Sequence, residues 1–120
     1  MRNHKDLRVW DEAHRLTLAI YKATQSFPKD ERFGLTSQLR RASASIAANL
    51  ADGCGRRADG EMGRFVLIDM GSASGLSYHM LLASDLGFLS QEQYAELRLH
   101  AECGMKMLSA LSGKLRSSAA

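Results

Sequence analysis

Five arginines give this sequence its clearest capacity for chemistry. They are Arg40, Arg41, Arg56, Arg57 and Arg64. A guanidinium group presents a fixed fork of N–H donors that matches two phosphate oxygens at once, so arginines grouped on a surface favour nucleic-acid binding. The spacing predicts that all five surround one helix-turn-helix corner. A solvated basic face explains the same pattern, because acidic residues stand among the arginines and would partly neutralise them; these are Asp52, Asp59 and Glu61.

The segment from Gly55 to Gly60, GRRADG, has the glycine spacing of a phosphate-binding loop. In such a loop the next two residues are a lysine and a serine or threonine, which hold the phosphates and a magnesium ion. Glu61 and Met62 occupy those positions here. The sequence also lacks a G-x-S-x-G elbow and any pattern that would assemble a catalytic triad. We therefore predict no catalytic residues and a protein that is not an enzyme.

Two pairs of potential metal ligands have helical spacing, Asp11 with His14 and His100 with Cys103. Each pair offers two ligands, whereas a zinc site needs three or four, so we predict neither a metal nor another cofactor. The chain has only two cysteines, too few for a disulfide framework. We expect Cys54, in a glycine-rich turn, to be exposed and Cys103, in a helical pattern, to be buried.

The composition indicates one helical domain over residues 1–120. The chain is 45% hydrophobic and 24% charged, with one proline and few aromatic residues, which favours helix over strand. Its net charge of +3 fits an anionic partner but also many ordinary proteins. No apolar stretch of about 18 residues could span a bilayer, and no apolar targeting segment opens the chain, so we expect no membrane association and a cytoplasmic location.

The apolar pattern predicts a first helix over residues 7–25. Its inner stripe has alternating spacings of four and three residues and consists of Val9, Ala13, Leu16, Ile20, Ala23 and Phe27. Pro28 ends the helix, because proline excludes helical geometry at the residue before it. Trp10 and Tyr21 lie off the stripe and form a second apolar patch, available to a neighbouring helix or another subunit.

Three further helices are predicted over residues 36–52, 59–86 and 91–115, followed by a polar tail, 116–120, that we expect to fray. In the third helix the apolar residues expected near the core are Phe65, Ile68, Leu82 and Leu86 on one face, with Met62, Val66, Leu76 and Met80 beside them. Gly71 and Gly75 lie one turn apart in this helix. Glycine costs ~1 kcal/mol against alanine in a helix interior, so the two glycines predict either a kink or a close crossing with another backbone, and we favour the crossing.

The fourth helix begins with a capping-box pattern, Ser90 and Gln93. Its core stripe repeats the spacing of the first helix through Leu97, Ala101, Gly104, Leu108, Leu111 and Leu115. Four helices joined by short connections predict an all-α fold, an antiparallel up-down-up-down four-helix bundle.

Several longer runs resemble one known protein family. The runs are DLRVWDEAHRLTLAIY, FPKDERFGLTSQLRRASASIAANLADG, RFVLIDMGSASGL and LGFL. In order and spacing they are similar to the four-helix-bundle proteins encoded in intervening sequences of bacterial 23S ribosomal RNA genes, over residues 5–115. That family includes the basic, pentameric accessory protein of diversity-generating retroelements, a partner of a reverse transcriptase.

The resemblance implies a bacterial homopentamer with a nucleic-acid role and a reverse transcriptase as a potential partner. The family's recurrent positions are occupied here by Gln38, Arg40, Arg41, Ser45, Asn49, Asp52, Gly53, Arg64, Phe65, Gly71 and Ser72. Two positions depart from the family, since Asp52 and Gly75 stand where it usually has glutamates. If the glutamate at position 75 normally pairs with Arg40 or Arg41, that arginine is freer here to meet a phosphate or an acidic subunit.

The polar residues Gln38, Ser45 and Asn49 fall on nearly one face of the second helix, where they would fix helix register through hydrogen bonds rather than bind a ligand. The leading hypothesis is a non-catalytic oligomer that binds structured RNA or an RNA–DNA hybrid through the five arginines. The alternative is a protein-interaction scaffold whose arginines contact acidic partner or subunit surfaces.

Overall fold

The computed structural model describes residues 3–56 and 59–119. The chain forms four α-helices, α1 (Arg8–Thr24), α2 (Leu35–Cys54), α3 (Asp59–Asp85) and α4 (Gln91–Ala119). Two short 3-10 helices, η1 (His4–Asp6) and η2 (Lys29–Glu31), precede α1 and α2. All regular structure in the described residues is helical, which confirms the predicted all-α, four-helix fold.

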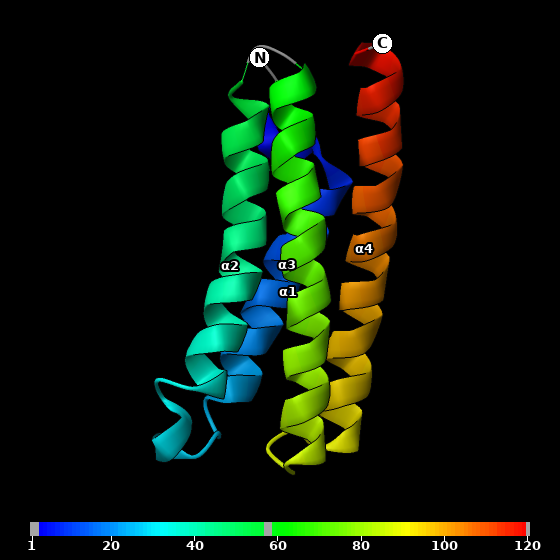
Figure 1. Ribbon diagram of the computed structural model, residues 1–120. Coiled ribbons are helices and arrows are strands. Elements are labelled where there is room, and N and C mark those ends of the chain that lie inside the picture. Colours follow the sequence, from blue (N-terminus) through cyan, green and yellow to red (C-terminus); the bar gives the residue numbers. More distant parts are fainter. Residues whose placement is uncertain (1–2, 57–58, 120) are drawn as a thin grey trace.

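The helices pack side by side in an elongated bundle of 46 × 21 × 20 Å. Figure 1 shows each helix running in the opposite direction to the one before it. α2 and α4 each pack against both α1 and α3, whereas α1 and α3 lie diagonally across the bundle and their backbones are not adjacent. Each helix therefore has two neighbours and buries the stripe between them.

The predicted core stripe of α1 is buried in full, from Val9 to Phe27. Trp10 is half-buried against the core, and its ring stacks on His14 with the ring centroids 5.1 Å apart. Tyr21 lies under the guanidinium of Arg40 from α2. Of the patch expected beside the stripe, Trp10 is partly covered within the chain, whereas Tyr21 remains 44% exposed.

Of the two rows of apolar residues expected in α3, the row of Met62, Val66, Leu76 and Met80 is buried, whereas the other row is not. The buried stripe of α3 consists of Met62, Val66, Asp69, Ala73, Leu76, Met80 and Ala83. Ile68 and Leu86, expected near the core, are 55% and 53% exposed. The prediction failed for that row because α3 is apolar on nearly every side, so apolar spacing alone does not reveal which stripe faces the neighbouring helices.

The predicted backbone crossing at Gly71 and Gly75 is also wrong within this chain. Both glycines are exposed, and a Cβ atom built on either would meet nothing within 4 Å. The bundle itself therefore does not require glycine at these positions.

The turn into α4 follows the predicted capping box. The backbone N–H of Gln93 donates to Ser90 Oγ at 3.0 Å, and the N–H of Ser90 donates to Gln93 Oε1 at 2.9 Å. α4 then continues to Ala119, so the described part of the predicted tail is helical. The reason is that residues 116–119 contain no glycine or proline that would end the helix.

No helix within residues 3–56 or 59–119 combines the length and the apolar character needed to cross a membrane.

Leu108 tests the core of the bundle, because it is 2% exposed and lies in the buried stripe of α4. Leu108→Ala should lower the free energy of unfolding by about 2–5 kcal/mol through lost burial and the cavity left behind. Leu99→Ala is the matched control on the same helix, since Leu99 is 69% exposed; its cost should stay below ~0.5 kcal/mol. Urea titrations followed by circular dichroism measure both, and equal midpoints for the two variants would contradict the packing.

Candidate nucleic-acid interface

The candidate arginines form two groups rather than one corner. Arg40 and Arg41 lie in the second turn of α2, whereas Arg56 follows the end of α2 and Arg64 lies in the second turn of α3. At a rise of about 1.5 Å per residue, positions 40 and 56 are separated by about 24 Å along the helix. The single corner expected from the sequence is wrong, because about four turns of helix separate Arg41 from Arg56. Arg57 lies outside the described residues.

Arg40 points inward and ties α2 to the end of α1. Its Nε–H donates to Thr24 Oγ1 at 2.8 Å, and its Nη2 donates to the Tyr21 carbonyl oxygen at 3.3 Å. Its guanidinium lies 4.7 Å from the centroid of the Tyr21 ring. The last carbonyls of a helix lack partners within it and carry partial negative charge, so a cation there is favourable. The role of Arg40 is therefore chiefly structural.

Arg41, the next residue, points outward, as expected for side chains about 100° apart on a helix. Together with Phe33, Ser37, Gln38, Ala42 and Ser45, it lines a hollow on the outer side of α2. In residues 3–56 and 59–119 no carboxylate forms an ion pair with Arg41. Its guanidinium is thus available to an anion from outside.

Phe33 completes this hollow, and the sequence analysis missed it. Its side chain is 89% exposed, and the Arg32 guanidinium lies 5.6 Å from its ring centroid. Phe33 stands just before α2, outside both flanking helices, so no helical periodicity drew attention to it. An aromatic residue between an arginine and a glycine in a connecting segment was the available signal.

The start of α2 fixes the backbone next to Phe33. Glu31 Oε1 accepts a hydrogen bond from the backbone N–H of Leu35 at 3.0 Å, which caps the helix. A Cβ atom at Gly34 would lie 2.6 Å from that oxygen, so glycine lets the carboxylate reach the helix. The Glu31 carboxylate is thereby engaged by the N-terminus of α2.

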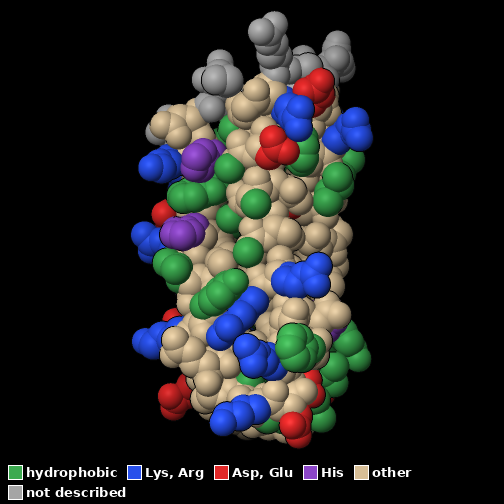
Figure 2. Space-filling view, turned by 90° about the vertical axis from the view of Figure 1, so that its left-hand side faces the viewer, with side chains coloured by type: hydrophobic (Ala, Val, Ile, Leu, Met, Phe, Trp, Pro, Cys, Tyr) green, Lys and Arg blue, Asp and Glu red, His purple; other side chains and the backbone are tan. Residues whose placement is uncertain are grey.

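Figure 2 shows the face that includes α2. Lys and Arg side chains gather in the lower half of this view, with apolar side chains among them and acidic side chains mostly toward the margins. The exposed basic residues of η2, the start of α2 and the end of α1 are Lys22, Lys29, Arg32 and Arg41. We call these four residues together with Phe33 the basic patch.

The second arginine group is more nearly neutral. Arg56 Nη2 lies 3.3 Å from Asp52 Oδ2, and its guanidinium stands 5.3 Å from the centroid of the Phe65 ring. Arg64 is exposed and lines a hollow with Arg56, Glu61, Phe65 and Ile68. Acids at both sides of this hollow reduce its attraction for phosphate compared with the basic patch.

Of the three polar residues predicted to fix helix register, Asn49 alone joins two helices. Its Nδ2 donates to Asp69 Oδ1 of α3 at 3.0 Å. Ser45 Oγ instead donates to the carbonyl of Ala42 on its own helix, and Gln38 is exposed.

Asp69 is a fully buried carboxyl group that the sequence analysis did not single out. Its Oδ2 has no hydrogen-bond partner in the part of the chain that the structure describes. Burial raises the pKa of Asp69 to about 7, against a smaller lowering by the Asn49 hydrogen bond. The folded chain thus holds a proton here that an unfolded aspartate would release near pH 4.

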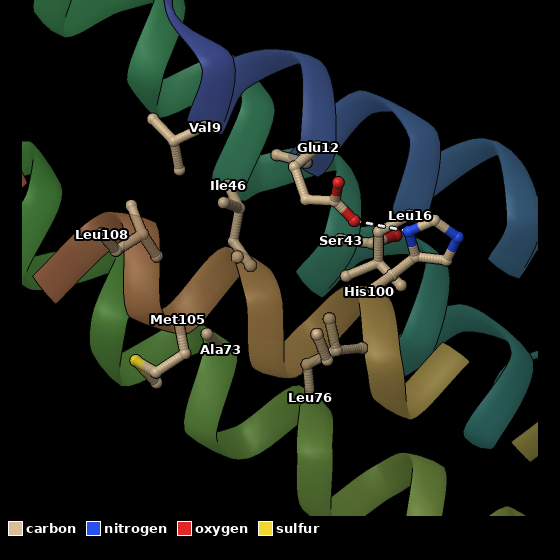
Figure 3. A pocket seen from close by; sticks show the side chains of 13 residues that line it. Val9, Glu12, Leu16, Ser43, Ile46, Ala73, Leu76, His100, Met105 and Leu108 are labelled. Carbon is tan, nitrogen blue, oxygen red and sulfur yellow. Dashed lines mark hydrogen bonds and ion pairs between the residues drawn. The ribbon is translucent and has the colours of Figure 1, made fainter. Parts of the chain in front are cut away.

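Among the described residues, the remaining polar groups do not converge on a metal site. Midway along the bundle the helices leave a cavity of about 20 Å³, room for a single water molecule. Figure 3 shows the Glu12 carboxylate hydrogen-bonded to the His100 ring at the edge of this cavity. Within the described ranges, no three His, Cys, Asp or Glu side chains could hold a metal ion together.

The two cysteines are placed opposite to expectation, since Cys54 is buried and Cys103 is exposed. α2 extends through the predicted glycine-rich turn and carries Cys54 into the core. Position 103 falls on the outer side of α4, between the buried residues Ala101 and Leu108 of its stripe.

Residues 5–110 match the sequence model of a protein family described as 23S rRNA-intervening sequence protein. The matched range begins in η1, contains α1, α2 and α3 entirely and reaches well into α4, so it includes both arginine groups. No curated protein matches the chain.

The raised pKa of Asp69 makes stability depend on pH. Because the folded-state pKa lies above the usual 3.8, stability should fall as pH rises from about 4 to about 7 and stay low above that. Asp69→Asn keeps the shape and removes the charge, so it should stabilise the fold at pH 8 by up to roughly 4 kcal/mol and have little effect near pH 4. Urea unfolding at several pH values measures this, with Asp30→Asn as an exposed control. An identical pH profile for wild type and Asp69→Asn would contradict the assignment.

Proposed function

The chain belongs to the family of 23S rRNA-intervening sequence proteins, and on this premise we propose that it is a non-catalytic, oligomeric protein that binds RNA through its basic patch. The family's name connects it with ribosomal RNA. The observation that carries the proposal is the hollow in which Arg41, an arginine with no ion-pair partner among the described residues, stands beside the exposed ring of Phe33.

Each part of this hollow suits a different part of a nucleotide. The guanidinium of Arg41 would bind a backbone phosphate through two N–H donors. The ring of Phe33 would stack on an unpaired base, with Arg32 beside it adding a favourable cation–π contact. Ser37 and Gln38 would hydrogen-bond to base edges or to the ribose 2′-hydroxyl.

This combination favours a structured RNA with at least one unstacked base. The grooves of a regular RNA helix offer phosphates and 2′-hydroxyls, whereas aromatic stacking needs a base that has left the helix. An RNA–DNA hybrid would satisfy the arginines alone and should bind more weakly than RNA with a loop or bulge. We place this activity in the cytoplasm, together with the RNA.

Self-assembly would increase the attraction for RNA. A chain with a net charge of +3 has a modest field, but several copies of the basic patch in one particle would form a large anion-attracting surface. A ring of five is the assembly that the family resemblance implies. Arg56 and Arg64 would then add peripheral phosphate contacts.

The first test is RNA binding by Arg41→Glu. The variant should fold normally, because Arg41 is exposed, and should bind a stem-loop RNA at least about tenfold more weakly, since a lost charge-assisted hydrogen bond costs roughly 1.5–3 kcal/mol. Each lost phosphate contact should also flatten the plot of log affinity against log salt by about 0.7–0.9. Fluorescence anisotropy at several salt concentrations gives both quantities.

The matched control is Arg98→Glu, the same charge reversal at an exposed site on α4, where Arg98 pairs with Glu102. It should change RNA affinity far less. Phe33→Ala should weaken binding to a looped RNA more than to a blunt duplex. Arg40→Glu is unsuitable for this test because it breaks the contacts that join α1 to α2. Wild-type protein without salt-sensitive binding to RNA or hybrid would overturn the proposal and favour a protein-interaction scaffold.

The second test is the mass of the particle in solution. At micromolar concentration, light scattering on a sizing column should give about five times the chain mass of 13.2 kDa. A single monomeric peak would contradict self-assembly.

A further inference from the structure

The outward side of α3 has the character of a buried surface. The exposed fractions of its large apolar side chains are 59% for Leu67, 55% for Ile68, 59% for Tyr78 and 42% for Leu81. At about 200 Å² for a fully exposed side chain of this size, the four offer roughly 400 Å² of apolar surface, about half of what each partner contributes to a standard interface. An apolar patch of this size marks an interaction surface.

Two glycines lie in the middle of this surface and point to a close neighbour. They belong to a row with spacings of three and four residues, which we call the outer seam: Ile68, Gly71, Gly75, Tyr78 and Leu82. Such spacing is typical of a helix that packs along its length on another helix. Glycine is unfavourable in a helix interior, and the surroundings of both glycines within the chain are open. A backbone from another molecule can therefore approach closely here.

A second uncharged surface lies on another side of the bundle, over α1 and α2. Arg40, Ala44 and Ala48 follow each other on α2 at intervals of four residues, so both alanines share the side on which Arg40 contacts α1. Ala48 is exposed and Ala44 half-buried. On α1, Leu18 is 57% exposed and lies one turn from Tyr21, the residue that Arg40 contacts. We call Leu18, Tyr21, Ala44 and Ala48 the receiving face.

The receiving face is the surface of this chain that suits the outer seam. In the upper half of Figure 2, apolar side chains lie along the middle of the α2 side, while charged side chains lie at its upper end and margins. The outward side of α4 instead carries Glu92, Glu96 and Lys106, all exposed. An apolar seam that covered these residues would bury charges without partners, which is costly.

The two faces also agree in height along the bundle. The hydrogen bond from Asn49 to Asp69 places these residues at about the same height on the antiparallel helices α2 and α3. Counting from it along both helices gives two pairs of small residues that differ in height by one residue, or about 1.5 Å. The pairs are Ala48 with Gly71 and Ala44 with Gly75. Rotation about an axis parallel to the bundle keeps every residue at its height.

We propose that copies of this chain join head to tail, with the outer seam of one copy packed on the receiving face of the next. Two unlike faces on one chain generate a ring when the rotation closes. Because α3 stands diagonally across from α1, the two faces point apart by more than a right angle without being opposite (Figure 1). The two neighbours of a subunit in a ring of five are arranged in the same way. The inference rests on the proposed self-assembly and names the faces that meet in it.

This contact leaves the RNA-binding hollow accessible. Arg41, Ser45 and Asn49 form the next row on α2, and Asn49 of that row contacts α3 of its own chain. The hollow with Arg41 therefore lies on a different side of α2 from Ala44 and Ala48.

Cysteine cross-linking tests both faces at once. In a Cys103→Ser background, Ala44→Cys/Gly75→Cys should form disulfide-linked species up to a covalent pentamer under mild oxidation, because the Cα atoms of neighbouring copies would lie within the distance that a disulfide spans. Either substitution alone should give single chains on a denaturing, non-reducing gel, because in a head-to-tail contact neither face meets itself. Ala44→Cys/Ser77→Cys is the matched control, since Ser77 is exposed on another side of α3, and it should also give single chains.

Gly75→Leu tests the contact without a new thiol. A side chain at position 75 meets nothing in its own chain, so the variant should keep the helical circular dichroism spectrum. It should nevertheless lose the mass of five chains on a sizing column, because the leucine holds the two backbones apart. Gly113→Leu, the same change at a glycine of α4 with open surroundings, should keep that mass.

The outcomes separate this contact from the proposed function. If the wild-type chain assembles and binds RNA but Ala44→Cys/Gly75→Cys does not cross-link, or Gly75→Leu keeps the mass of the assembly, the assignment of faces is wrong while the proposed function stands. A disulfide-linked dimer of Gly75→Cys alone would indicate a two-fold contact and overturn the head-to-tail one. A monomeric wild-type chain that binds RNA would overturn this contact and self-assembly together, but not RNA binding.

Discussion

Burial of one apolar stripe from each helix is the constraint on which the rest of this structure depends. A helix in the bundle has two neighbours and can bury only the stripe between them. Once Leu16 and Ile20 of α1 and Leu76 and Met80 of α3 are fixed inside, the direction of every other side chain follows. The same packing that buries Leu39 of α2 turns Arg41 outward and leaves Leu67, Ile68 and Tyr78 of α3 exposed.

The positions of Arg40 and Arg41 show how neighbouring residues acquire different roles from this constraint. Arg40 faces α1 and takes the place of a helix cap, since it donates to Thr24 and to a terminal carbonyl. The charge of Arg40 therefore stabilises the contact between α1 and α2. Arg41 has the same chemistry but lies on the open side of α2 beside Phe33. The difference between their roles comes from helix geometry. Two residues of the same type therefore cannot be assigned a common function from the sequence alone.

Sequence patterns predicted the core stripe of α1 completely but the buried face of α3 only in part, although they gave the bounds of α3 almost correctly. In α1 the residues outside the stripe are mostly polar, so one apolar face stands out from the rest. In α3 two seams have the same spacing on opposite sides, and Ile68 therefore looks as suitable for the core as Val66. Helix geometry predicts that Arg40 and Arg41 point in different directions. The partners of Arg40 lie on α1, however, and no local sequence pattern reveals them. Phe33 was missed because it belongs to no periodic element, and Cys54 was misplaced because α2 runs further than its glycines suggested.

Most contacts between helices join helices that are consecutive in the chain, and this favours rapid folding. Three of the four helix pairs in contact, α1 with α2, α2 with α3 and α3 with α4, are consecutive in the chain. The α3–α4 hairpin is closed by a short turn with Gly87 at φ +80° and by the capping box at Ser90. Contacts between consecutive elements cost little loop-closure entropy, and such topologies are typical of rapid folding. The pairing of α1 with α4 is the one that joins distant segments, so formation of the α1–α4 contact is the natural last step of folding and its loss the natural first step of unfolding.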